Sequence, residues 1–172
     1  MEAEAETRKH IQLVAKFLHI FSCELLKRAT LHDQSKLEEP EASVLSKYTP
    51  FLRTCAYGSE EYKQILSSPE MKAALSHHYA HNKHHPEFND VNGFSFQTLN
   101  DPIRSMDLID FVEMACDWLA STRRHDTGSI GKSITINAER FHLDEQITAL
   151  LRNTTALLED FEKRDYPAKS GD

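Results

Sequence analysis

The chain has 172 residues, with 20 Lys and Arg against 27 Asp and Glu, for a formal net charge of -7. This acidic balance excludes a broad electrostatic surface for a DNA or RNA polymer. No apolar run approaches the roughly 20 residues of a membrane span, and the acidic first six residues are unlike a signal or transit peptide. The three cysteines are widely spaced and form no CxxC pair, which favours a reducing compartment and predicts a cytoplasmic protein.

Scarce glycine (5) and modest proline (6) predict an all-α protein, a single compact helical bundle of about 6–8 helices. Apolar residues with a 3.6-residue period predict a first helix over about 6–28. Pro40 suits the first turn of a second helix, about 40–55, and Glu41 lies favourably near its positive end. A turn at 57–60 precedes a short third helix. Ser68 caps a fourth helix, which begins at Pro69 and stops near Pro86.

Residues 86–100 are the least regular stretch, and their three phenylalanines suggest a loop fixed to the body. A long helix is expected over about 102–123, followed by a loop at 124–132 and two helices at 133–141 and 144–163, the last capped by Asp144. We expect one domain over residues 1–165 and a disordered tail at 166–172. The last helices carry more apolar residues than one stripe needs, which either a homodimer or ordinary core burial explains.

His32 and Asp33 form the first pair of residues that could carry chemistry. A neutral imidazole and an adjacent carboxylate can bind one divalent metal if a turn points both inward. A turn histidine beside a capping aspartate is the plainer interpretation of the same dipeptide.

Glu113 and Asp117 form a second pair, four residues apart on one face of an otherwise apolar helix. Carboxylates in such surroundings are costly unless they are paired or metal-bound. A solvated stripe, or a pair between Glu113 and an arginine, is the alternative.

Five of the ten histidines of the chain lie between His77 and His85. On a continuous helix His78 would share a face with Asn82 and His85, and His77 would share one with His81 and His84. A metal or phosphate site explains this density better than packing does, with a solvated or pH-sensitive surface as the alternative. His10 lies on the apolar face of the first predicted helix and is expected to point inward.

The order His10, His32-Asp33, histidine cluster, Asp117 resembles the HD-domain superfamily of metal-dependent phosphohydrolases, and Lys36 matches the HDxxK form of its motif. Over about residues 7–155 the chain also resembles an uncharacterised family of phage and bacterial genomes, catalogued as domain of unknown function 5662. The residues that carry this resemblance are 28, 31–37, 40–41, 48–50, 57–63, 77–87, 107–110, 113–118, 124–125, 133–137 and 140–141.

The resemblance to the HD superfamily implies a single metal bound by His10, His32, Asp33 and Asp117. Mn, Fe, Co, Ni and Zn all suit such mixed nitrogen and oxygen ligands. It further implies a metal-activated water that attacks a small phosphorylated substrate, which we expect to be a nucleotide, in a bacterial or phage-infected cytoplasm.

Roles for the remaining candidates follow from the same hypothesis. Lys36 would steady a phosphate oxygen or the Asp33 carboxylate, and Glu113 would orient a ligand or act as general base. The cluster would either bind a second ion or bind substrate phosphate, with an imidazolium as general acid. If the cluster binds a second ion, the ligands are His77, His78 and His84. If it binds substrate phosphate, the contacts come from His78, Asn82 and His85, and His84 is the general acid. Tyr79 and the loop at 86–98 are candidates for a base-stacking wall, with core anchoring as the alternative.

Two other classes of function compete with the phosphohydrolase. The HD scaffold also hosts di-iron oxygenases, which use a similar set of histidines and aspartates. The chain could equally be a non-catalytic ligand-binding or inhibitor protein with a structural metal. A metal position open to solvent favours catalysis, and a closed coordination shell does not.

Overall fold

The computed structural model describes residues 2–56, 58–89, 103, 106–124 and 128–165. Seven α-helices follow one another within these residues: α1 (Glu2–Leu31), α2 (Glu41–Leu52), α3 (Glu60–Leu66), α4 (Pro69–His81), α5 (Leu108–Thr122), α6 (Ile130–Arg140) and α7 (Glu145–Asp165). Two short 3-10 helices join them, η1 (Gln34–Leu37) and η2 (Pro86–Asn89). No strand occurs in this described part of the chain, which confirms the all-α fold class.

Side-chain caps fix where several helices begin. The Ser59 and Ser68 hydroxyls accept hydrogen bonds from backbone N–H groups of α3 and α4, as predicted. Asp107 Oδ1 accepts from Ile109 N at 2.8 Å, so α5 begins at Leu108 rather than near residue 102. Ser129 caps α6, which therefore begins three residues earlier than predicted.

The end of α4 differs from the prediction in a way that matters for the histidines. The helix ends at His81, because Asn82 adopts an extended backbone with φ -123° and ψ 102°. The segment that carries His84 and His85 is therefore not helical. These two side chains can turn back toward the start of η1, which a continuous helix would not allow.

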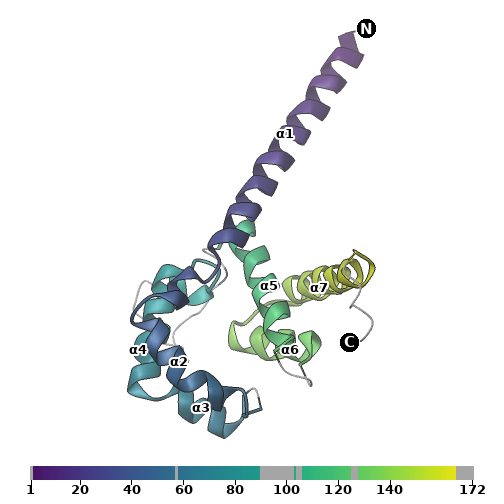
Figure 1. Cartoon of the computed structure of the whole chain (residues 1–172). Helices are drawn as coiled ribbons and strands as arrows, with labels where there is room; N and C mark the ends of the chain where they lie inside the picture. Colours follow the sequence, from purple (N-terminus) through teal and green to yellow (C-terminus); the bar gives the residue numbers. More distant parts are fainter. Residues whose placement is uncertain (1, 57, 90–102, 104–105, 125–127, 166–172) are drawn as a thin grey trace.

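The described helices form two packed groups (Figure 1). In the first group α4 packs against α2, α3 and both 3-10 helices; in the second, α5 packs against α6 and α7. The main apolar core belongs to the second group and is built from Phe111, Met114, Ala115, Trp118, Ile134, Phe141 and Leu151. Helix α1 contacts α5 and leads directly into η1, so the two groups meet at the carboxyl end of α1.

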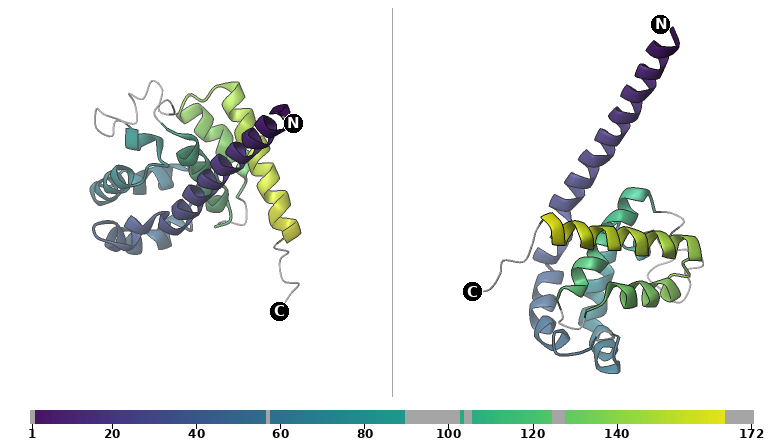
Figure 2. Two further views of the ribbon diagram at one scale, coloured as in Figure 1. Left: turned by 90° about the horizontal axis from the view of Figure 1, so that it is seen from above. Right: turned by 90° about the vertical axis from the view of Figure 1, so that its right-hand side faces the viewer.

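Helix α1 extends far beyond both groups, as Figures 1 and 2 show from three sides. All its residues from 2 to 20 are exposed, and its partly buried residues, among them Phe21, Leu25 and Arg28, lie nearer its carboxyl end. It begins four residues earlier than predicted and continues three residues further. Of the helices described here, none is both long and apolar enough to span a bilayer.

Candidate metal centre

Asp33 lies at the point where the chain leaves α1 and enters η1. Its φ of 55° places it in the left-handed region, which Asp tolerates better than most residues. The tight turn directs its carboxylate inward, and the side chain is 12% exposed. Lys36, one 3-10 turn later, donates to Asp33 Oδ2. The condition for a shared metal, a turn that points His32 and Asp33 inward, is therefore met, and Asp33 makes no side-chain cap.

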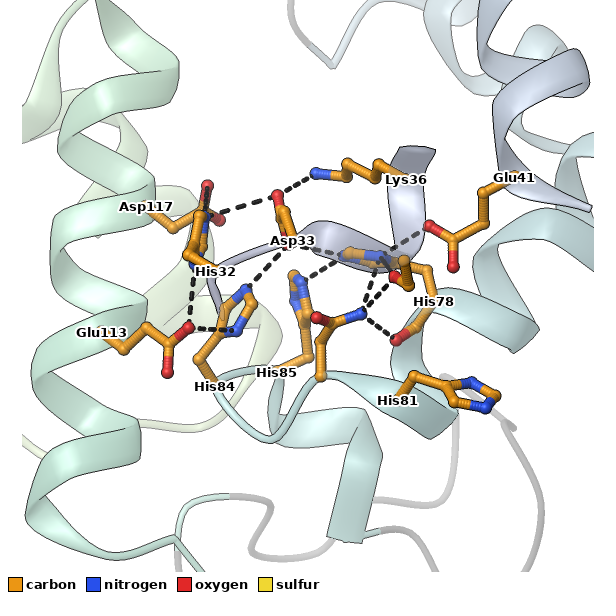
Figure 3. Close-up of polar contacts among 12 residues, drawn as sticks. His32, Asp33, Lys36, Glu41, His78, His81, His84, His85, Glu113 and Asp117 are labelled. Carbon is orange, nitrogen blue, oxygen red and sulfur yellow. Dashed lines mark hydrogen bonds and ion pairs between the residues drawn. The ribbon is translucent and has the colours of Figure 1, made fainter. Parts of the chain in front are cut away.

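Three of the four residues predicted to hold one metal come together (Figure 3). His32 Nε2 lies 3.4 Å from Asp33 Oδ2 and 3.7 Å from Asp117 Oδ1. Ligand atoms of the three residues all lie within 4.8 Å of one another. We call His32, Asp33 and Asp117 the open set, because their side chains are 12–30% exposed.

A second group of potential ligands lies on the other side of Asp33. His78 Nε2 is 3.4 Å and His84 Nε2 is 3.6 Å from Asp33 Oδ1, and His78 Nε2 is 2.8 Å from His85 Nε2. Ligand atoms of these four residues also lie within 4.8 Å of one another. We call Asp33, His78, His84 and His85 the buried set, because His78 and His84 are 4% and 1% exposed. Asp33 belongs to both sets.

Carboxylates behind the histidines determine which ring nitrogen faces Asp33. Glu113 Oε1 lies 2.9 Å from His32 Nδ1 and 3.1 Å from His84 Nδ1, and Glu41 Oε2 lies 2.9 Å from His78 Nδ1. An ionised carboxylate only accepts hydrogen bonds, so each Nδ1 carries the proton. A neutral imidazole held this way presents the lone pair of Nε2 toward Asp33. Carboxylates support metal-binding histidines in the same manner.

Three buried polar atoms lack any hydrogen-bond partner within the described residues: one is Glu87 Oε2, and the other two belong to the buried set. These two are Asp33 Oδ1 and His84 Nε2, which face each other at 3.6 Å. Two acceptors that face each other in a buried site are unfavourable unless a proton or a cation lies between them. The mixture of imidazole nitrogens and carboxylate oxygens fits Mn, Fe, Co, Ni or Zn. The residues present therefore fit a divalent ion.

Protonation differs between the two sets. Hydrogen bonds to Asp117 and Glu113 raise the pKa of His32 to about 10, even though burial opposes this shift. Burial alone would raise the pKa of Asp117, but the hydrogen bond from His32 and the charge of Lys36 outweigh it, so the pKa lies below its usual range. Without an ion, His32 and Asp117 form a charged pair at neutral pH.

The buried histidines behave oppositely. Burial lowers the pKa of His85 to about 2, and the neighbouring His84 and His78 add to this effect. Burial is also the main reason why the pKa of His78 is lowered. Both rings stay neutral at pH 7, which is the form that binds metals.

Helix α5 supplies the acidic side of the cluster, and an arginine of α1 anchors it. Arg28 donates to Glu113 Oε2 at 2.9 Å and to Asp110 Oδ1 at 2.6 Å. Burial raises the pKa of Glu113, but hydrogen bonds from His32 and His84 hold it below its usual range. Glu113 is thus an ionised group that orients two imidazoles, which is one of its two predicted roles.

The structure does not bring His10 to the cluster. His10 is exposed on α1, 22 residues before His32 on one continuous helix, so roughly 33 Å separate them at 1.5 Å per residue. His10 of the same chain therefore cannot join His32, Asp33 and Asp117 at one metal, so the predicted set of four ligands is wrong. The predicted inward position of His10 is also wrong. The apolar stripe around His10 is genuine, but the described part of this chain packs nothing against it.

His77 also lies outside both sets. Because α4 ends at His81, His77 does not share a face with His84, as a continuous helix would require. His77 Nδ1 instead lies 2.8 Å from Glu41 Oε1, and its ring stacks on His81 with centroids 4.1 Å apart. Figure 3 shows His81 turned away from the cluster.

Four residues predicted to contact substrate are enclosed instead, among them His78 at 4% exposure. Asn82 is 8% exposed and donates to Ser35 Oγ at 2.8 Å, so it positions η1 against α4. Tyr79 is buried with its ring 5.0 Å from that of His85, which favours core anchoring over a stacking wall. His84, also predicted as an acid, is 1% exposed. Residues 90–98 of the predicted wall lie outside the described residues.

Three supporting residues that carry the family resemblance were not assigned to the site: Arg28, Glu41 and Asp110. The contact of Arg28 with Glu113 corresponds to the arginine pair considered as the alternative for Glu113. Arg28 precedes His32 by one helical turn, and Asp110 precedes Glu113 by three residues, so both could have been found by helical spacing. Glu41 was placed only at the start of a helix. No local pattern shows that its side chain, 1% exposed, reaches both His77 and His78.

Comparison with known proteins identifies a family for the chain. No curated protein and no solved structure shows significant similarity to it. The model of one family, described as a family of unknown function (DUF5662), matches residues 1–163. This match covers all seven helices except the last two residues of α7. The chain therefore belongs to the DUF5662 family.

Proposed function

We propose that this protein is a metal-dependent phosphohydrolase that acts on a small phosphorylated compound, with nucleotides as the substrate class. The observation that carries the proposal is the place of Asp33 between two sets of potential ligands. Its Oδ2 lies nearest the open set, and its partnerless Oδ1 faces the buried set. A carboxylate shared in this way suits two neighbouring divalent ions.

The difference in exposure between the two sets favours catalysis over a purely structural metal. His32 is 30% and Asp117 15% exposed, whereas His84 is 1% exposed. Structural metal sites are enclosed by protein ligands, while catalytic ones keep a position for water or substrate. The open set provides such an edge, and the buried set holds its ligands away from solvent.

Positive charge beside the open set favours an anionic substrate. Lys36 contacts Asp33 and also borders an open hollow of about 550 Å³. Its lining combines the polar Arg53, Ser46 and Thr49 with apolar residues, which are Leu37, Ala42, Leu45 and Pro50. Cations and hydroxyl groups of this kind bind phosphate oxygens. A phosphate group at this edge would lie between Lys36 and the open set.

Each residue of the site then has a stated task. Glu113 and Glu41 hold three imidazoles with Nε2 toward Asp33, and Lys36 offsets charge at the substrate. His32 would have to release its proton to solvent for an ion to bind at the open set. A bound divalent ion would supply a water of lowered pKa and would neutralise charge on the transferred phosphoryl group.

The choice of phosphoester over other hydrolysable bonds rests on the resemblance to the HD-domain superfamily. His32, Asp33, the central histidines and Asp117 occur in the order that the superfamily uses. The absence of His10 from the cluster departs from that pattern, and His84 of the buried set fills part of the gap by sharing Glu113 with His32.

The test is metal analysis of protein purified without chelator, followed by phosphate release across a panel of nucleotides and sugar phosphates. Asp33→Ala should lose both bound metal and turnover, because it removes the residue common to both sets. His81→Ala is the matched control, since His81 lies beside the cluster but faces solvent. It should keep both properties.

Three results would overturn the proposal. Protein that neither retains nor takes up a divalent ion has no metal centre. Bound iron with oxygen uptake and no phosphate release would favour the di-iron oxygenase. Bound metal without turnover on any phosphorylated compound would favour a ligand-binding or inhibitor protein.

A further inference from the structure

The amino-terminal part of α1 is a helix that no described part of the chain covers. Residues 2–20 are all exposed, and Figures 1 and 2 show this stretch standing clear of the other helices. Most helices in proteins are stabilised chiefly by packing of an apolar face. No such packing is present for this stretch among the described residues.

The apolar residues of α1 follow a seven-residue repeat. Ile11, Val14, Leu18, Phe21 and Leu25 are alternately three and four residues apart, which is the spacing of a coiled-coil seam. We call these five residues the α1 seam. Ile11, Val14 and Leu18 are 60%, 43% and 64% exposed. Single exposed apolar residues are common, but a contiguous stripe of this length marks an interaction surface.

No described residue covers Ile11, Val14 or Leu18 of the seam. Arg28, one turn beyond Leu25 on this side of the helix, is held by Asp110 and Glu113 of α5, which fixes the direction of α1. Residues 2–31 contain neither glycine nor proline, so the helix has no residue that favours a hinge. Among the described residues, the contacts of α1 leave the seam only partly buried at Phe21 and Leu25 and exposed from Leu18 to Ile11.

We propose that two copies of this chain associate through the α1 seam as an antiparallel helix pair. In one register four of the five seam positions meet an apolar residue, and Leu25 lies opposite Thr7 of the partner subunit. Val14 then lies opposite Leu18 of the partner subunit, and Ile11 lies opposite Phe21 of the partner subunit. The two-fold axis passes near residue 16, and the two bodies lie at opposite ends of the pair.

Like charges within the seam disfavour the parallel arrangement. In the antiparallel register His10 lies beside Glu24 of the partner subunit, and the contact occurs twice by symmetry. Phe17, which is 64% exposed, lies beside Phe17 of the partner subunit at the axis. A parallel pair would instead place Glu4 against Glu4 of the partner subunit within the seam, and like charges at such positions are unfavourable.

The experiment is light scattering across a concentration series combined with small-angle X-ray scattering of the full chain. We expect a mass of twice 19.7 kDa and an elongated particle with its two bodies far apart. Leu18→Glu should weaken the dimer about 100-fold or more, because each copy would bury an unpaired carboxylate. Ile20→Glu is the matched control: Ile20 is 48% exposed but lies off the seam, so this variant should stay dimeric.

Fluorescence of Trp118, the single tryptophan, reports whether the α5–α7 core of each variant is folded, since Trp118 belongs to that core. Leu157→Glu tests the exposed face of α7, where Leu157 is 51% exposed. Four results would overturn the proposal: a monomeric wild-type chain, a parallel shape with adjacent bodies, equal losses from Leu18→Glu and Ile20→Glu, or dissociation by Leu157→Glu. None of these readouts depends on a metal or on turnover.

Discussion

Helix α5 has two faces that meet opposite surroundings. Phe111, Met114 and Trp118 lie on one face and pack into the apolar core with α6 and α7. Glu113 and Asp117 lie on the other face, where His32 from the turn before η1 contacts both and His84 from the segment after α4 contacts Glu113. One helix thus separates the main apolar core of the molecule from its candidate metal centre.

The two faces contribute to the protein in different ways. Burial of apolar side chains stabilises the fold whatever is bound. The acidic face collects carboxylates and imidazoles whose desolvation is costly unless each finds a partner, and Asp33 Oδ1 and His84 Nε2 find none in the described part of the chain. The apolar face should therefore govern the stability of the metal-free protein, and the acidic face should govern the response to metal.

The largest expected effect is on the apolar face. Met114→Ala removes a side chain that is 0% exposed and should lower the free energy of unfolding by about 3 kcal/mol, with or without metal. Leu108→Ala, at the 57% exposed start of the same helix, should change it by less than about 0.5 kcal/mol. Urea unfolding followed by Trp118 fluorescence measures both. A Met114→Ala effect that disappears when metal is removed would show that the two faces are not separate.

The next effect concerns the acidic face and separates its two sets of ligands. Asp117→Ala should remove the ion of the open set and leave that of the buried set, while His78→Ala should do the reverse. Saturating metal at 100 times its dissociation constant stabilises a protein by about 2.7 kcal/mol per site, so each variant should lose about that amount. Metal content after dialysis and urea unfolding with and without metal measure the two losses. Loss of both ions from either variant would mean that the sets form one site.

A smaller effect is expected from the carboxylate behind the buried set. Glu41→Gln keeps the size of the side chain but weakens its bonds to His77 and His78, so metal affinity should fall about 10- to 100-fold. Glu39→Gln is the control, because Glu39 is exposed and accepts a hydrogen bond from the Ser43 hydroxyl, away from the histidines. Competition with a chromophoric chelator gives the affinities. Equal effects of the two substitutions would remove Glu41 from the site.

The parts of the fold and of the site that depend on residues close together in sequence could be predicted from the sequence. The four-residue spacing of Glu113 and Asp117 predicts their common face, and both carboxylates lie near His32. The adjacent His32 and Asp33 indicated a metal site only if a turn pointed both inward, and the sequence did not decide whether it does. The caps Ser59, Ser68 and Asp144 were predictable because each depends on neighbours in one element.

Interactions between elements were not visible. Periodicity shows that α1 has an apolar face but not which molecule covers it, and His10 was therefore placed inside the chain. The grouping of His77 with His84 failed because the helix ends at His81, where no glycine or proline marks the boundary. Glu41 gives no periodic signal, and only tertiary contacts bring it to the histidines.

The smallest expected effect is a pH dependence of stability in metal-free protein, carried by His32. Its pKa of about 10 in the folded state lies above the ordinary 6.5, because Asp117 and Glu113 bind the protonated ring. The stabilisation is therefore complete below about pH 6.5, falls as the pH rises, and is lost above about pH 10. The effect should be modest, since His32 is 30% exposed and solvent screens its partners.

Urea unfolding of wild type and His32→Gln, both in chelator, would isolate this contribution between pH 6.5 and 10. The difference between the two should shrink with rising pH, because other titrating groups are common to both proteins. Bound metal must displace the same proton, so metal affinity should rise with pH over this range, by at most tenfold per unit for one proton. A difference that is constant with pH would mean that His32 is neutral in the folded, metal-free protein. The open set could then take up an ion without releasing a proton, and its affinity would not depend on pH in this range.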